Sequence, residues 1–220
     1  MTREELIRKV ALKMDEISSS DNVIVNVVES DNNPLYTQID GLLDESVNDV
    51  LLKAPVHRLT SQIGNITMTL KNNSGVGTYV LEEIFDKTRK KLVFDVPDDF
   101  LRLASYTDAK FDRPIVDVSL EGDSVANMQR NKFLFAKSSK PVAVLGRDAN
   151  GKRVISCYSY AKDDTVKPDV RYVKRFTEDS DIDDYLSDIV TWVCAGRVFD
   201  SRGDINHSKM CSDNAASLMV

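Results

Sequence analysis

Only five side chains of the 220-residue chain are histidine or cysteine, the residue types behind most structural zinc sites and much general-base catalysis. His57 lies at a predicted helix end, where a structural histidine is the commoner case. His207 and Cys211 are four residues apart and could share one helical face, and Cys157 and Cys194 could complete a zinc site. Structural zinc sites usually contain paired short spacings such as C-x2-C, however, and this chain has none. We therefore expect no bound metal and three reduced thiols.

The other sequence patterns associated with catalysis or cofactor binding are incomplete. Gly75-Val-Gly77 is followed by Val80 where a dinucleotide-binding loop would have its third glycine, and it precedes a predicted strand. No serine lies in a G-x-S-x-G sequence, and no lysine lies in a phosphate-binding loop. The acidic residues from Glu178 to Asp188 lack the alternating ligands and the glycine of a calcium loop. The sequence thus predicts no catalytic residue, no cofactor and a protein that is not an enzyme.

The densest group of positive charges falls in a predicted turn between two strands. It consists of Lys87, Arg89, Lys90 and Lys91. A solvated hairpin tip is the first interpretation, because charged side chains there also discourage edge-to-edge strand pairing. An interface with an acidic partner surface is the second.

The C-terminal segment has a weak helical pattern. Arg202-Gly-Asp204 predicts a turn between two helices, and an adhesion motif is the less favoured alternative. Met210, Leu218 and Met219 follow without a strong amphipathic period, so little apolar burial would order residues 204–220 alone. We therefore expect this tail to be mobile in the free subunit and ordered by a partner.

Two helices are predicted at the N-terminal end of the chain. Thr2-Arg-Glu-Glu5 fits a capping box ahead of an apolar stripe that ends at Ile17. Asn33-Pro34 supplies an N-cap and a favourable first helical residue for a second helix, which Pro55 ends. The conformation of residues 18–32 stays open, because their short β-branched run fits a strand or a buried coil equally well.

The middle of the chain changes to a period of two, and the end returns to helix. Alternating apolar residues and turn sequences such as Asp148-Ala-Asn-Gly151 predict antiparallel strands, without the βαβ spacing of a parallel sheet. A helix capped by Ser180 follows. The predicted fold class is α+β: a helical body formed by both chain ends, residues 1–62 and 177–220, with an antiparallel β module, residues 63–176, inserted between them.

Composition excludes several classes of protein. Hydrophobic residues make up 42% of the chain, which is enough for a core and too many for a mainly disordered protein. The net charge of −6 argues against a generally basic nucleic-acid binder. The first residues are charged and show no signal peptide, and the best apolar run, Ile189 to Ala195, is far shorter than a membrane span.

A family resemblance adds a functional indication that composition cannot give. Val93-Phe-Asp-Val-Pro-Asp-Asp-Phe-Leu-Arg-Leu103 resembles a phrase of structural proteins of tailed bacteriophages, in which a strand runs into a V-P-x-D-F sequence and a further strand. Gln129-Arg-Asn-Lys-Phe133 and Lys140-Pro-Val-Ala-Val144 continue the same order. Together with helical chain ends, these segments resemble head-to-tail connector proteins, in particular the neck ring proteins of crAss-like phages. The Val-Pro-Asp-Asp-Phe phrase is then a fold signature in which Asp99 caps the next element and Phe100, Leu101 and Leu103 join the core.

The resemblance implies a structural virion protein that assembles with copies of itself into a ring of the neck, dodecameric like the portal. Its partners would be the portal and an adjacent neck or tail protein, and double-stranded DNA would pass without specific binding. No membrane partner is implied, and assembly would take place in the host cytoplasm. The alternative is another non-enzymatic tail, baseplate or fibre-attachment adaptor. The segments free to reach partners are the basic hairpin and the tail, so the candidate contact residues are Lys87, Arg89, Lys90, Lys91, Arg202, Met210, Leu218 and Met219.

Overall fold

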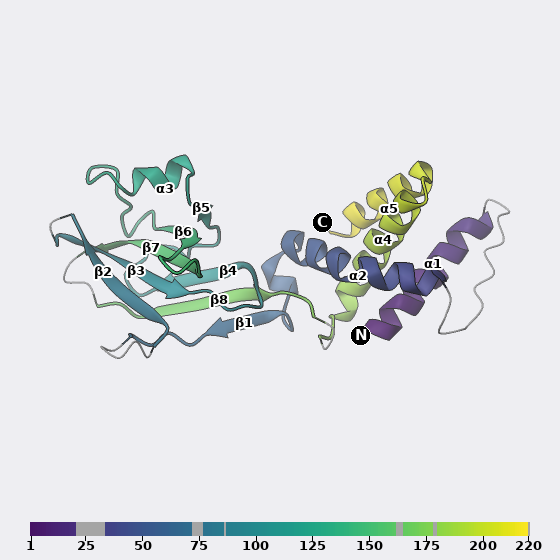
Figure 1. The fold of residues 1–220 in the computed structure, drawn as a ribbon, viewed down its shortest axis with the longest axis horizontal. Helices are drawn as coiled ribbons and strands as arrows, with labels where there is room; N and C mark the ends of the chain where they lie inside the picture. The colour runs from purple at the N-terminus through teal and green to yellow at the C-terminus, as the bar shows by residue number, and fades with distance from the viewer. Residues whose placement is uncertain (21–33, 72–76, 86, 162–164, 178–179, 220) are drawn as a thin grey trace. The chain divides into compact units, whose positions relative to one another are not determined.

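The computed structural model describes the whole chain except residues 21–33, 72–76, 86, 162–164, 178–179 and 220 (Figure 1). The described chain has the expected mixed α+β class, with helices from both ends of the sequence and antiparallel-rich sheets from its middle. It divides into a helical unit, residues 1–62 with 175–220, and a β unit, residues 63–174. The second boundary lies two residues before the one proposed from the sequence.

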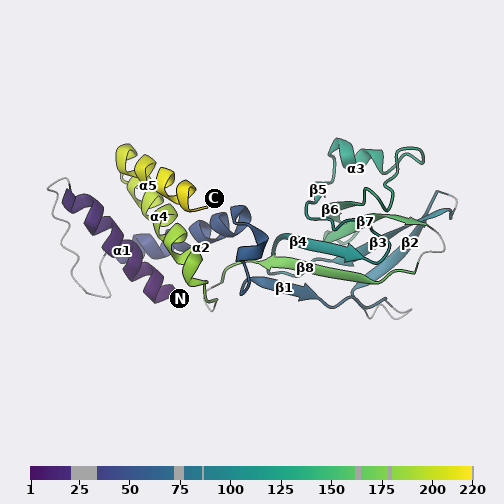
Figure 2. The same ribbon diagram turned by 180° about the vertical axis from the view of Figure 1, so that it is seen from behind.

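The helical unit has four α-helices and one short 3-10 helix among its described residues. These are α1 (Arg3–Ser20), α2 (Pro34–Lys53), η1 (Val56–Arg58), α4 (Asp184–Ser201) and α5 (Ile205–Leu218). Helix α4 packs against α1, α2 and α5 (Figure 2). Its centre is accordingly apolar on nearly all sides, and Leu186, Ile189, Val190 and Ala195 are almost completely buried.

The two N-terminal helices begin where the sequence indicates. The capping box forms, because the Thr2 amide donates to Glu5 Oε2 over 2.8 Å and the Glu5 amide donates to Thr2 Oγ1 over 3.4 Å. Helix α1 then continues through Ser18 to Ser20, three residues beyond the expected end. Helix α2 begins at Pro34, whereas its proposed N-cap Asn33 and the undecided segment from residue 21 lie outside the described residues.

The start of α4 differs from the expectation. Ser180 does not cap the helix, which begins four residues later at Asp184. The Ser180 hydroxyl is instead 2.8 Å from the Thr177 hydroxyl, and its oxygen also accepts from the Thr177 amide. A local turn therefore uses the serine before the helix begins.

The C-terminal segment forms a packed helix, so the expectation of a mobile tail is wrong. Helix α5 packs along α4, and Cys211 and Ala215 are buried in the contact. The two helices approach closely at Gly196, where an added Cβ would lie 3.1 Å from Cys211 Cβ. Asp204 caps α5 by accepting from the His207 amide. Small residues make this interface, and a search for large apolar residues at helical spacing misses it.

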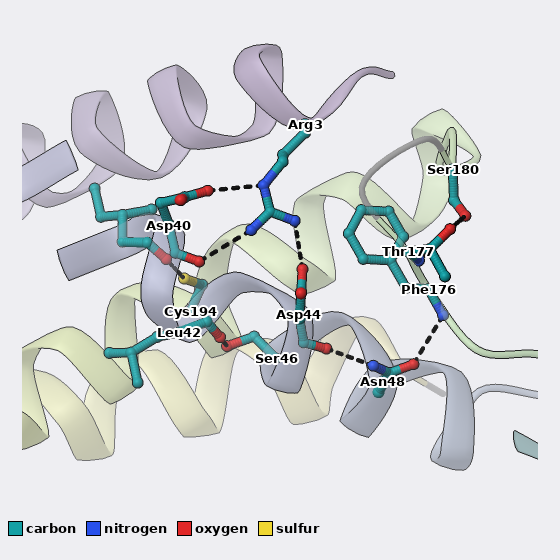
Figure 3. Close-up of polar contacts among 11 residues, drawn as sticks. Arg3, Asp40, Leu42, Asp44, Ser46, Asn48, Phe176, Thr177, Ser180 and Cys194 are labelled. Carbon is teal, nitrogen blue, oxygen red and sulfur yellow. Dashed lines mark hydrogen bonds and ion pairs between the residues drawn. The ribbon is translucent and has the colours of Figure 1, made fainter. Parts of the chain in front are cut away.

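A polar network joins segments of the helical unit that lie far apart in the sequence (Figure 3). Arg3 of α1 donates through Nε to Asp40 Oδ1 of α2 over 2.7 Å, and its guanidinium also pairs with Asp44. One turn further along α2, Asn48 donates to the Asp44 carbonyl over 2.8 Å and accepts from the Phe176 amide over 2.9 Å. The network thus holds the N-terminal helix and the chain returning from the β unit on one helix.

The β unit contains two sheets. Its described elements are β1 (Ile63–Ile66), β2 (Tyr79–Ile84), β3 (Arg89–Asp95), β4 (Phe100–Asp108), β5 (Ser119–Leu120), α3 (Ser124–Met128), β6 (Val142–Arg147), β7 (Arg153–Ala161) and β8 (Pro168–Lys174). One sheet has the strand order β1-β8-β4 and the other β2-β3-β7-β6-β5. All described pairs between these strands are antiparallel except β5 with β6, which are parallel over two residues. The expectation that the chain has no parallel pairing is therefore wrong for β5 and β6. A strand of two residues is too short to show a hydrophobic period in the sequence.

One apolar core joins the two sheets. Phe94, Ile155 and Tyr160 from the five-stranded sheet share it with Leu103 and Tyr106 from the three-stranded sheet. The Tyr106 and Tyr160 hydroxyls are hydrogen-bonded to each other inside it. Burial raises the pKa of both phenols far above the ordinary tyrosine value. The pair is a polar link within an otherwise apolar layer.

The Val-Pro-Asp-Asp-Phe phrase forms the turn between β3 and β4. Phe100 and Leu103 are buried as expected, whereas Leu101 is only half-buried. Asp99 accepts from the Tyr172 hydroxyl of β8 over 2.9 Å. The aspartate therefore fastens the turn to a neighbouring strand, which replaces the capping role expected of it.

The turn between β6 and β7 has the chemistry that the sequence indicates. Asp148 Oδ1 accepts from the amides of Asn150 and Lys152 over 2.9 and 2.8 Å. Gly151 has a φ of 81°, which favours glycine. This hairpin prediction is confirmed.

Candidate interaction surfaces

The basic residues of the β2–β3 hairpin are less free than the sequence suggests. Only Lys87 lies in the turn, whereas Arg89, Lys90 and Lys91 lie in β3 and face β2. The Lys91 ammonium is 2.8 Å from a carboxylate oxygen of Glu82, and that of Lys87 is 3.8 Å from Glu83. The Lys91 side chain is only 24% exposed, against 75% for Lys87. A cross-strand acid therefore neutralises Lys91, and Lys87 has a looser and more exposed acidic neighbour.

A cleft of about 590 Å³ lies in the β unit beside this hairpin. Polar and charged side chains from three parts of the sequence line it, including Lys91, Glu121, Arg130 and Tyr158. The β unit contains no histidine, and Cys157 is completely buried. Burial raises the pKa of that thiol well above its ordinary range, so it is protonated at neutral pH. The cleft can offer hydrogen bonds and charge, but its described lining residues include no nucleophile with an adjacent histidine base.

The histidines and the other two cysteines belong to the helical unit. His207 Nδ1 lies 2.6 Å from Asp204 Oδ2, and this hydrogen bond lowers the pKa of the Asp204 carboxyl. Burial raises the pKa of the Cys194 and Cys211 thiols to about 11 each. Among the described residues, no three His, Cys, Asp or Glu side chains are grouped as a metal site requires.

The C-terminal candidate residues lie on or beside α5. Met210 and Leu218 are exposed, and Met219 is half-buried at the end of the helix. Arg202, after the end of α4, donates through Nε and Nη2 to Gln38 Oε1 of α2 over 3.0 and 2.8 Å. The structure thus gathers these residues in the helical unit and places the four basic hairpin residues in the β unit, so they do not form one site within a unit.

A groove that sequence reasoning missed lies among α2, α4 and α5. It has a volume of about 470 Å³ and is lined by Val193, Gly196, Asp200, Ala215, Ala216 and Met219, among others. Ser208, Ser212 and Ala216 contribute small side chains at four-residue spacing along α5. That spacing was visible in the sequence as a signal of a shallow helical face.

A second missed surface lies in the β unit between β5 and β6. Val125, Met128, Phe133 and Leu134 are all exposed there, and Phe133 is 91% exposed. The sequence showed these apolar residues in an aperiodic stretch but could not show that they are outside the core. The structure shows that these four apolar side chains, close together in the sequence, are exposed.

The two units carry opposite net charge. The helical unit contains twenty Asp and Glu against ten Lys and Arg, a net charge of −10. The β unit contains fifteen Asp and Glu against nineteen Lys and Arg, a net charge of +4. The overall charge of −6 therefore conceals an acidic unit and a basic one.

Comparison with known proteins adds no family: no family model matches the chain, and no curated protein matches it. In the part of the chain that the structure describes, no helix combines the length and the apolar character that crossing a membrane requires. Proposals about function therefore depend on the fold, the surfaces and the resemblance of the sequence.

Proposed function

We propose that this protein is a structural, non-enzymatic subunit of the neck of a tailed bacteriophage. Copies of it assemble into a ring that joins the portal to the tail and lets DNA pass. The observation that carries the proposal is the chain order: both ends build one helical unit, and an antiparallel-rich β unit is inserted between them. That order is the one implied by the resemblance to connector proteins, which includes the strand phrases from Val93 to Tyr160 and the helical chain ends.

The charge distribution supports the same proposal. A channel for DNA must not bind it tightly, and binding to phosphate is driven by clustered Lys and Arg. The helical unit has twice as many acidic as basic residues and would repel phosphate. A ring with the helical unit toward the channel would let DNA slide, while the β unit remains available for protein partners.

The second candidate is an adaptor at the tail, baseplate or fibre attachment site of such a phage. The exposed apolar residues around Phe133 favour a protein-binding role of either kind. The two candidates differ in copy number and in neighbours, because a neck ring has as many subunits as its symmetry requires and contacts the portal or the next ring.

Quantitative mass spectrometry of purified virions tests the proposal. The chain should be present in a copy number that matches the portal protein, and cross-links should join it to the portal or to an adjacent neck or tail protein. One or two copies per virion, or cross-links only to the capsid shell, would refute the neck assignment.

A further inference from the structure

The backbone that carries the exposed Phe133 side chain is anchored on both sides. The Phe133 amide donates to Asn131 Oδ1, and the Leu134 amide donates to the Asn131 carbonyl. On the C-terminal side Phe135 is buried, with its ring 5.4 Å from that of Phe85 in an edge-to-face contact. The loop that carries the Phe133 ring is therefore hydrogen-bonded on both sides, and little backbone entropy is lost when a partner covers the ring.

A second anchor holds the segment from the other end. Gln129 is buried and accepts from the Ala136 amide through Oε1 over 2.9 Å, which closes the loop. Packing of the core does not explain this closed loop, because the apolar residue at its tip, Phe133, is exposed to solvent. An exposed aromatic residue on a rigid support is typical of a binding hot spot.

The same segment, residues 124–140, is uniformly positive. It contains Arg130, Lys132, Lys137 and Lys140 and no acidic residue. All four are exposed, and none forms an ion pair with another residue that the structure describes. A matching surface would be apolar at its centre and negative around it.

The α2–α4–α5 groove of the helical unit offers the apolar centre, its own two acids and two bases balance, and the unit around it supplies the negative charge. Small and apolar residues line it, including Gly196, Ala215 and Met219. Asp49 and Asp200 line it, with Arg197 paired to Asp49 and Lys53 as the other cation. The unit around the groove has a net charge of −10, so the long-range field favours a positive partner.

We propose that Phe133 of one copy inserts into the α2–α4–α5 groove of a second copy, with the cations of residues 124–140 facing the acidic helical unit. The proposal deepens the proposed function, because it names the contact between neighbouring ring subunits. Phe133 and the groove belong to different surfaces of the chain, so the contact between two copies is heterologous. A heterologous contact closes into a ring when the rotation that relates neighbouring copies allows it. The groove volume of about 470 Å³ leaves room for one aromatic side chain and its neighbour Leu134.

The test places a photo-reactive benzoylphenylalanine at position 133 of the full chain. Isotopically labelled and unlabelled protein are mixed at the highest soluble concentration, irradiated, and analysed as peptides. We expect mixed-isotope cross-links from position 133 to peptides that contain residues 193–219. Cross-links within one chain, cross-links to other surfaces, or none would overturn the proposal. Transfer of the cross-links to added double-stranded DNA would overturn it as well, and would assign the surface to nucleic acid.

Matched variants separate the contact from general effects on folding. Ala216→Trp fills the groove from an exposed position and should reduce the intermolecular cross-links at least about tenfold, whereas the neighbouring Ser217→Trp, also exposed but outside the groove, should leave them unchanged. Equal effects of the two tryptophans would contradict the groove assignment. Virion copy number distinguishes the two proposals. Many copies in the neck without this cross-link would support the proposed function and refute the Phe133 contact. The cross-link in a protein that is absent from the neck would support the contact and refute the proposed function.

Discussion

Removing the Tyr160 hydroxyl should destabilise the β unit more than removing both hydroxyls of the buried tyrosine pair. Tyr106 of β4 and Tyr160 of β7 are 0% exposed and link the two sheets, and Tyr160 also donates to Asp108 Oδ2 over 3.3 Å. Of the partners that the structure describes for the Tyr106 hydroxyl, Tyr160→Phe leaves the Cys157 sulfur, a weak acceptor. A buried hydroxyl without a good partner costs about 1–3 kcal/mol, so the free energy of unfolding should fall by that amount.

The double variant Tyr106→Phe with Tyr160→Phe supplies the contrast. Both hydroxyls are then absent, and Asp108 still accepts from the amides of Lys110 and Lys167 over 3.0 and 2.8 Å. The one buried group that then loses a described partner is the weakly polar Cys157 thiol, so the double variant should be more stable than Tyr160→Phe alone.

Urea unfolding, with hydrogen exchange in β4 and β7, measures the free energies of unfolding of the unchanged protein, of Tyr160→Phe and of the double variant. The fluorescence of Trp192, the only tryptophan and a residue of α4, reports on the helical unit in the same samples. Losses that simply add in the double variant would refute the account of the tyrosine link.

The remaining predictions concern pH, two glycines and the C-terminal helix. Burial holds the pKa values of Tyr106 and Tyr160 above the ordinary value near 10, so near that pH only the unfolded chain ionises them. The free energy of unfolding, measured by urea titration, should therefore fall as pH rises above 10. The same dependence on pH in the double phenylalanine variant would contradict this. Gly64→Ala should lower the melting temperature and cost about 1–3 kcal/mol, since its Cβ would lie 2.7 Å from the Tyr172 ring. Gly41→Ala, in open space on α2, should stabilise the protein by about 1 kcal/mol. Stability changes of the same sign for both variants would show that the close approach does not matter. Deleting residues 205–220 should lower the melting temperature of the helical unit, because α4 loses its cover at Gly196, and an unchanged calorimetric transition would return α5 to the role of a dispensable tail.

Strong local signals predicted much of the fold. The capping box at Thr2, the proline at the start of α2 and the Asp148 turn act within a few residues, so the sequence alone contains their physics. The same holds for the order of helical ends and inserted strands, because the hydrophobic period changes where the units meet.

Features that depend on distant residues were not predictable in this way. Helix α5 is fixed by a close approach of Cys211 to Gly196, and neither residue contributes to a large apolar stripe. The basic hairpin is neutralised in part, because strand register places Glu82 opposite Lys91. Phe133 is a candidate contact residue because it is exposed, and its neighbours in the sequence do not reveal that exposure.

The central claim, that this protein is a ring subunit of a phage neck, is tested most directly by electron cryomicroscopy of purified virions. We expect a closed ring of density between portal and tail into which the helical unit and the β unit each fit, once per subunit, with the acidic helical unit toward the DNA. Density for this chain at a fibre, at the baseplate or in the capsid shell, with no copy in the neck, would contradict it.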